Sequence, residues 1–72
     1  MEKATIKCYK GNATAFYLGN FYTINWDGME WDNEEDWNEW ADEELSAIKG
    51  AENYEDVKRT LLISTSHKIK SY

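Results

Sequence analysis

The sequence predicts a small α+β domain, in which a three- to four-stranded antiparallel sheet is covered by one main amphipathic helix at about residues 33–49. Three observations lead to this class. The first 26 residues form short alternating segments separated by glycine-containing dipeptides, a single strong helix pattern follows, and 72 residues leave room for one domain only. We therefore expect residues 1–72 to form a single α+β domain.

The amino-terminal segments have the two-residue period of half-buried strands. In Ala4 to Tyr9, alternate residues share a face, and the dipeptides Gly11-Asn12 and Gly19-Asn20 signal turns on either side of a second strand, Ala13 to Leu18. A third strand, Phe21 to Trp26, precedes the hairpin-type dipeptide Asp27-Gly28. The regular spacing of these segments predicts an antiparallel meander.

The helix pattern extends from Asp32 to Lys49 and has a signal at each end. Asp32 is the expected N-cap, Glu35 would complete a capping box, and Gly50 would end the helix in the left-handed conformation. At 100° per residue an apolar arc forms, and we expect it to cover the meander. The predicted core is Ile6, Cys8, Phe16, Leu18, Tyr22, Ile24, Trp26, Trp37, Trp40, Ala41, Leu45 and Ile48.

The segment after Asn53 fits two structures. Tyr54, Val57 and Leu61 have helical spacing, whereas the β-branched stretch from Thr60 to Thr65 favours a strand. We expect a short helical turn from Tyr54, followed by a strand around residues 61–64 that joins the sheet.

The net charge of −6 is distributed unevenly along the chain. Residues 1–26 carry one acid and three lysines, residues 27–44 carry ten acids and no base, and residues 45–72 carry five bases and three acids. An asymmetry of this kind bears on partners and association rates rather than on fold. The acidic middle segment is thus the main functional signal in the sequence.

Acidic side chains of the helix fall on the arc opposite its apolar stripe. Five carboxylates over eight residues give about one negative charge per 2.4 Å of helix, against about one per 1.7 Å of duplex DNA and one per 3.4 Å of each strand. Like charges three or four residues apart destabilise a helix by about 0.2 to 0.5 kcal/mol per pair. We expect a surface that binds a basic partner, formed by Glu35, Asp36, Glu39, Asp42 and Glu43 and extended by Glu30 and Asp32.

Catalytic and metal-binding motifs are not found in the sequence. His67 and Cys8 are single and far apart, a calcium loop starting at Asp27 or Asp32 lacks the glycine it needs at its sixth position, and no nucleophile motif is present. Glu44 falls inside the apolar arc, where it is either a site residue or a carboxylate at the edge of the stripe. We expect no catalytic activity, no cofactor and no metal.

A secondary candidate surface consists of Tyr9, Tyr17 and Phe21, expected on the outer face of the sheet near Lys7 and Lys10. The group resembles a small platform for stacking bases. Because ten carboxylates would meet an approaching phosphate backbone, we expect no direct binding of nucleic acid. The aromatic side chains would instead pack under the carboxyl-terminal segment or bind a protein.

The acidic and aromatic stretch WDNEEDWNEWADEEL follows a hairpin-rich segment. With these features, and in its size, acidity and aromatic content, the chain resembles the small inhibitors of phages and mobile elements that mimic DNA. These include anti-CRISPR and anti-restriction proteins. The resemblance implies a non-catalytic inhibitor that occupies the nucleic-acid or PAM-binding channel of a host defence enzyme. Its acidic residues would take the place of phosphates against arginine and lysine.

Two other classes stay open at this point. One is an adaptor or regulatory domain that uses the aromatic sheet face, and the other is a small carboxylate enzyme or metal protein that uses Glu44. We expect a partner with a basic protein surface, in the first place a nucleic-acid-processing enzyme, and a homodimer through the sheet edge is compatible with each class.

No apolar run is long enough for a membrane span, and no signal peptide is seen. We therefore expect a cytoplasmic location, which would be the cytoplasm of the host cell if the protein is phage-encoded.

Overall fold

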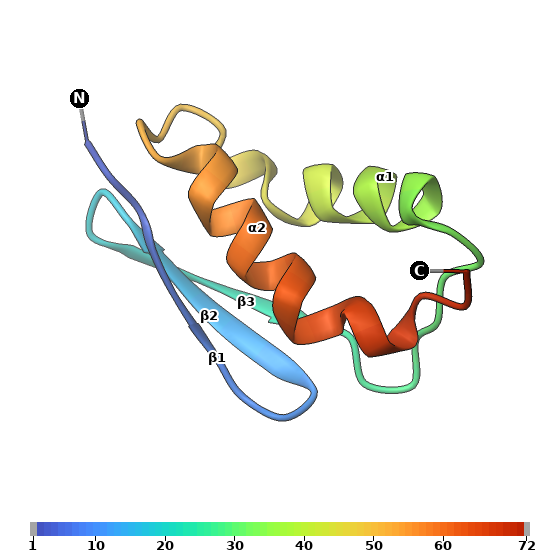
Figure 1. The fold of residues 1–72 in the computed structure, drawn as a ribbon. Helices are drawn as coiled ribbons and strands as arrows, with labels where there is room; N and C mark the ends of the chain where they lie inside the picture. Colours follow the sequence, from blue (N-terminus) through green and yellow to red (C-terminus); the bar gives the residue numbers. More distant parts are fainter. Residues whose placement is uncertain (1, 72) are drawn as a thin grey trace.

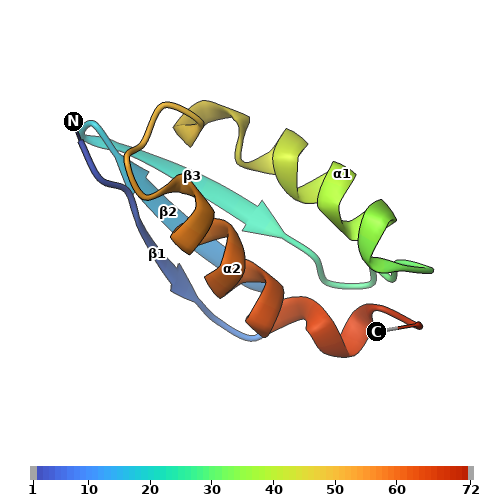
Figure 2. The same cartoon turned by 45° about the horizontal axis from the view of Figure 1, so that its top comes forward.

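The computed structural model describes residues 2–71 and has a three-stranded antiparallel meander on which two helices lie (Figure 1). The α+β class predicted from the sequence is confirmed. The elements in chain order are β1 (Thr5–Cys8), β2 (Asn12–Tyr17), β3 (Asn20–Asn25), α1 (Glu34–Glu44), the 3-10 turn η1 (Ser46–Ile48), α2 (Tyr54–Thr65) and the 3-10 turn η2 (Ser66–Lys68). Both helices lie on the same side of the sheet, which leaves its other face uncovered (Figure 2).

Strand β2 is the middle strand, and its inner face is made of small residues. Ala15 pairs with Ile6 of β1 and with Tyr22 of β3, and Ala13 is fully buried beside Ile24. Alanines at the centre of the sheet leave room for large side chains from the elements above it. The tryptophans at positions 26 and 37 are each only 2% exposed.

The prediction that Phe16 and Leu18 belong to the core was wrong. The β2–β3 turn is formed by Leu18 and Gly19, at φ 51° and 79°, so Phe16 pairs with Phe21 on the outer face. Positive φ at both positions is the geometry of a type I′ hairpin turn, and cross-strand partners share a face. With Tyr22 facing inward, Phe16 has to face outward, whatever its hydrophobicity.

Helix α1 begins one residue later than predicted. Asn33, not Asp32, is the N-cap, and its Oδ1 accepts a hydrogen bond of 2.9 Å from the backbone N–H of Asp36. Asp36 therefore takes the third helical position that Glu35 was expected to fill. Gly50 is not in the left-handed conformation, because α1 has already ended at Glu44 and passed into η1.

The strand expected around residues 61–64 is instead the second half of α2. Val57, Leu61 and Thr65 are spaced by four residues, and all three are buried against the sheet and α1. Two threonine hydroxyls are satisfied within the helix, since Thr60 Oγ1 donates to Asp56 O at 3.0 Å and Thr65 Oγ1 to Leu61 O at 2.8 Å. Burial at helical spacing outweighs the weak strand preference of this segment.

The core lies between the sheet and the two helices. Its buried apolar residues are Ala4, Ala13, Ala15, Ile24, Trp26, Trp31, Trp37, Ala41, Leu45, Ile48, Ala51, Val57, Leu61 and Ile69. Ile6, Cys8, Tyr22 and Trp40 are only half-buried at its edge. Trp31 and Trp40 have their ring centroids 4.7 Å apart, so the aromatic part of the core reaches into the β3–α1 loop.

One buried polar link joins the two helices. The indole Nε1 of Trp37 donates to Thr65 Oγ1 at 2.7 Å, and Thr65 is completely buried.

Segments near both chain ends are bonded to residues that are distant in the sequence. Trp31 pairs with Ile69 in a parallel bridge, and the Asn53 side chain bonds both the N–H and the C=O of Ala4 at 2.8 Å.

Candidate functional site

Four of the predicted site residues lie together on the exposed side of α1. Glu35, Asp36, Glu39 and Glu43 are all exposed. Within residues 2–71, none has a basic nitrogen within 4.0 Å. We call these four residues the acidic face.

The acidic face points away from the rest of the molecule because of its helical spacing. Trp37 and Ala41 are the buried residues of α1, and the four carboxylates lie on the opposite arc. Glu35, Glu39 and Glu43 follow one another at intervals of four residues, which is about 6 Å along the axis. Four charges over the same eight residues give about one per 3 Å, close to the roughly 3.4 Å per phosphate along one DNA strand.

Glu30 and Asp32 lie in the β3–α1 loop, beside the first turn of α1. Both are exposed, but both are near the same cation, because Lys70 Nζ lies 3.6 Å from Glu30 Oε1 and 3.8 Å from Asp32 Oδ1. Exposed ion pairs at these distances hold side chains only weakly. Their charge is thus partly neutralised, unlike that of the acidic face.

Asp42 does not belong to the exposed row, and that part of the prediction was wrong. Its Oδ1 accepts from Lys58 Nζ and from the Tyr54 hydroxyl, both at 2.8 Å, so its side chain faces α2. The hydrogen bond from Lys58, followed by that from Tyr54, lowers the pKa of Asp42 below its usual value. Burial, together with the hydrogen bond to Asp42, raises the pKa of Tyr54.

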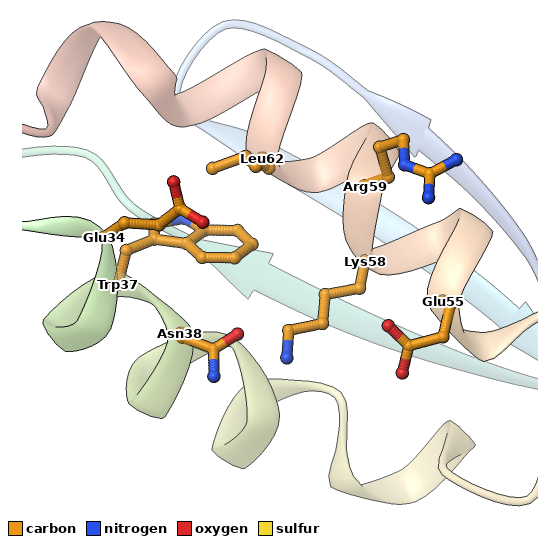
Figure 3. A pocket seen from close by; sticks show the side chains of 7 residues that line it. All are labelled: Glu34, Trp37, Asn38, Glu55, Lys58, Arg59 and Leu62. Atoms are coloured by element: carbon orange, nitrogen blue, oxygen red, sulfur yellow. The ribbon is translucent and has the colours of Figure 1, made fainter. Parts of the chain in front are cut away.

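A shallow groove of about 170 Å³ lies between α1 and α2 (Figure 3). Lys58 extends from α2 toward α1, and the indole of Trp37 lies beneath Glu34. The charges along the groove balance, since Glu34 and Glu55 stand against Lys58 and Arg59. A groove with balanced charges does not favour a ligand of either sign.

The secondary candidate surface, Tyr9, Tyr17 and Phe21, is not brought together. Tyr17 faces the core side of the sheet. Its hydroxyl lies close to Gly50, 3.3 Å from the position that a Cβ on that glycine would occupy. Tyr9 lies beyond the end of β1 and is 53% exposed. The sequence reasoning failed because it assigned the faces of β2 one residue out of phase.

The outer sheet face carries a different apolar group. Phe16 and Phe21 are in edge-to-face contact, with centroids 4.6 Å apart, and Leu18 follows at the hairpin tip. Their exposed fractions are 38%, 69% and 62%. The pairing rule of a two-residue hairpin could have identified this group from the sequence, because it places Phe16 opposite Phe21.

Glu44, the last residue of α1, is exposed rather than enclosed in an apolar pocket. No group of three or more potential metal ligands is found among residues 2–71. Within the same range no helix has the length and apolar character needed to cross a lipid bilayer.

Comparison with models of protein families, with characterised proteins and with solved structures finds no match to this chain. Functional inference therefore depends on the geometry of the molecule.

Proposed function

We propose that the protein is a non-catalytic inhibitor that binds the basic nucleic-acid or PAM-binding channel of a host defence enzyme, with the acidic face standing in for phosphates. The proposal rests on the acidic face, whose four exposed carboxylates have no basic nitrogen within 4.0 Å in residues 2–71, a property that Glu34 and Glu44 at the two ends of α1 share. Arginines on the partner would form charge-assisted, bidentate hydrogen bonds with them. Association would be fast and would weaken with salt.

The composition of α1 supports the proposal further. Three like-charge contacts, Glu35/Glu39, Asp36/Glu39 and Glu39/Glu43, together destabilise the helix by about 1 kcal/mol. Lysines interspersed among them would keep the protein equally soluble and would stabilise the helix. The helix dipole offsets part of this repulsion at Glu35 and Asp36, which lie in the first turn, but not at Glu39 and Glu43. The repulsion between Glu39 and Glu43 is better explained by a partner than by solubility.

The test reverses two charges and measures binding and competition. Immobilised protein is exposed to a bacterial lysate at low salt and at about 0.5 M salt, with and without excess duplex DNA, and bound proteins are identified by mass spectrometry. We expect capture of a nucleic-acid enzyme that is released by salt and by DNA. The double variant Glu39→Lys with Glu43→Lys should lose that capture while its fold is retained.

A matched control reverses two carboxylates outside the acidic face. Glu2→Lys with Glu52→Lys alters the net charge equally, at two exposed residues outside α1. It should keep most of the capture. If both double variants lose capture to the same degree, or if neither does, the acidic face is not the binding surface.

A second candidate function is an adaptor or regulatory domain that uses the outer sheet face. The exposed contact between Phe16 and Phe21, with the exposed Leu18 at the hairpin tip, favours this alternative, since contiguous apolar surface is a feature of protein–protein interaction sites. Capture that survives high salt and is lost on Phe21→Ser would identify it. The same variant should leave capture through the acidic face unchanged.

A further inference from the structure

At the end of the molecule opposite the β2–β3 turn lies a hollow of about 200 Å³ that the proposed function does not use. It is enclosed by the β1–β2 turn, the start of the β3–α1 loop and the carboxyl end of α2 with η2, which gather at one end of the fold (Figure 1). Its polar lining consists of Tyr9, Lys10, Asp27, Ser64, His67 and Lys68. We call it the basic hollow.

Unpaired cations converge on this hollow. In residues 2–71, five lysines have no carboxylate within 4.0 Å, and Lys10 and Lys68 both line the hollow. The other three are Lys3, Lys7 and Lys49. In a chain of net charge −6, this hollow is lined by two ammonium groups and an imidazole against a single carboxylate.

Lys68 gives a second and independent indication. Its side chain is half-buried, and its Nζ makes one long contact, of 3.5 Å, with the carbonyl oxygen of Trp26. An ammonium group has three N–H donors. At least two donors of Lys68 are therefore available to a group in the hollow.

Asp27 does not neutralise these cations directly. The carboxylate of Asp27 lies against the β1–β2 turn. A Cβ at Gly11 would lie 3.6 Å from the Oδ1 atom of Asp27. Gly11 has φ 85°, a left-handed conformation that glycine adopts readily in a tight turn. Asp27 thus lies at one wall of the hollow, and neither lysine is within 4.0 Å of it.

We propose that the basic hollow binds a small doubly charged oxyanion, namely the phosphate group of a small molecule, through Lys10 and Lys68. The imidazole of His67 and the hydroxyls of Tyr9 and Ser64 supply further hydrogen-bonding groups around the anion. The volume lies below the roughly 300 to 1,000 Å³ of sites for drug-sized ligands, so the ligand is small. Buried Trp26 forms the apolar wall of the same hollow.

The test is a titration followed by two-dimensional amide NMR, with inorganic phosphate, sulfate and acetate as probes. We expect saturable shifts at Gly11, Asp27 and His67 with phosphate and sulfate, and weaker ones with singly charged acetate. Phenyl phosphate forms a fourth arm. Tighter binding of phenyl phosphate, with shifts at Tyr9 or Trp26, indicates an organic phosphate, whereas equal binding indicates recognition of the phosphate group alone.

Two lysine variants separate the hollow from general attraction of anions. Lys68→Gln should weaken phosphate binding by about tenfold, because it removes a charge-assisted contact. The matched control Lys7→Gln makes the same charge change on the outer sheet face and should leave affinity within about twofold. Lys10→Gln, at an exposed position, provides the same test if Lys68→Gln disturbs the amide spectrum in the absence of phosphate.

Asp27→Asn gives a test of opposite sign. Removal of the one carboxylate in the hollow should tighten phosphate binding severalfold. The proposal is overturned if no saturable shift appears up to about 20 mM phosphate, or if Lys7→Gln and Lys68→Gln weaken binding equally.

Discussion

Helices α1 and α2 are nearly equal in length, with 11 and 12 residues, and they lie on the same face of the same sheet. Their charges differ completely. Helix α1 carries seven carboxylates and no base, whereas α2 carries two acids, Glu55 and Asp56, and two bases, Lys58 and Arg59. The fold thus places a strongly charged helix beside a neutral one of the same size.

The contacts between the two helices show which of these charges are bonded within the domain. Three side chains of α2, those of Tyr54, Lys58 and Thr65, bond to residues of α1. Of the α1 carboxylates, Asp42 alone receives such a bond within residues 2–71. Helix α2 thus holds α1 in place, while six of the seven carboxylates of α1 make no ion pair with a basic side chain within residues 2–71.

The largest effect on stability is expected where α1 enters the core. Trp37→Ala removes a side chain that is 2% exposed and should lower the free energy of unfolding by about 3 to 5 kcal/mol. Urea denaturation followed by circular dichroism measures this change. A loss below about 1 kcal/mol would mean that α1 is not held through this residue.

The next effect concerns the hydrogen bond between the helices. Thr65→Val keeps the shape of the side chain but leaves the buried Trp37 indole N–H without its acceptor, which should cost about 1 to 3 kcal/mol. Thr65→Ser is the control, because it retains the hydroxyl and loses only a methyl group. Equal losses in the two variants would show that packing, not the hydrogen bond, stabilises this position.

The smallest effect separates the two kinds of carboxylate on α1. Asp42→Asn should lower the free energy of unfolding by about 1 kcal/mol at pH 7, a figure reduced for the partial exposure of the ion pair. The pKa of Asp42 is lower in the folded protein than its usual 3.8, so its contribution is present above pH 3.8 and is lost as the pH falls through the folded value. Wild type and variant should therefore converge in acid.

A matched variant completes this test. Glu43→Gln removes an equal charge from the acidic face and should leave stability unchanged or slightly raised, because it relieves repulsion with Glu39. Parallel urea titrations from neutral pH to about pH 3 measure both variants. A loss of stability for Glu43→Gln as large as that for Asp42→Asn would remove the distinction between the acidic face and the inner carboxylate.

The sequence predicted the meander and α1 because those signals are local. Glycine dipeptides mark the turns, and Trp37, Ala41 and Leu45 recur at helical spacing. The faces of β2 were assigned wrongly because side-chain size was considered apart from hairpin register. The register makes Ala13 and Ala15 inner residues, and both are completely buried.

The candidate sites show the same limit. Glu35, Asp36, Glu39 and Glu43 were found from the sequence because helical spacing alone decides their exposure. Asp42 was misplaced because its environment depends on α2, a helix that was predicted in part as a strand. The basic hollow was missed for a related reason, since Lys10 and Lys68 are 58 positions apart and meet only through the tertiary fold.

The hydrogen bonds that join both end segments to the middle of the chain have a kinetic consequence. Ala4 with Asn53 and Trp31 with Ile69 are bridges between distant positions, so each closes a long loop and has to overcome its entropy. The meander and the helix pair involve shorter loops and are expected to form first. Folding should therefore end with the attachment of the two end segments, and partial unfolding should begin by their release.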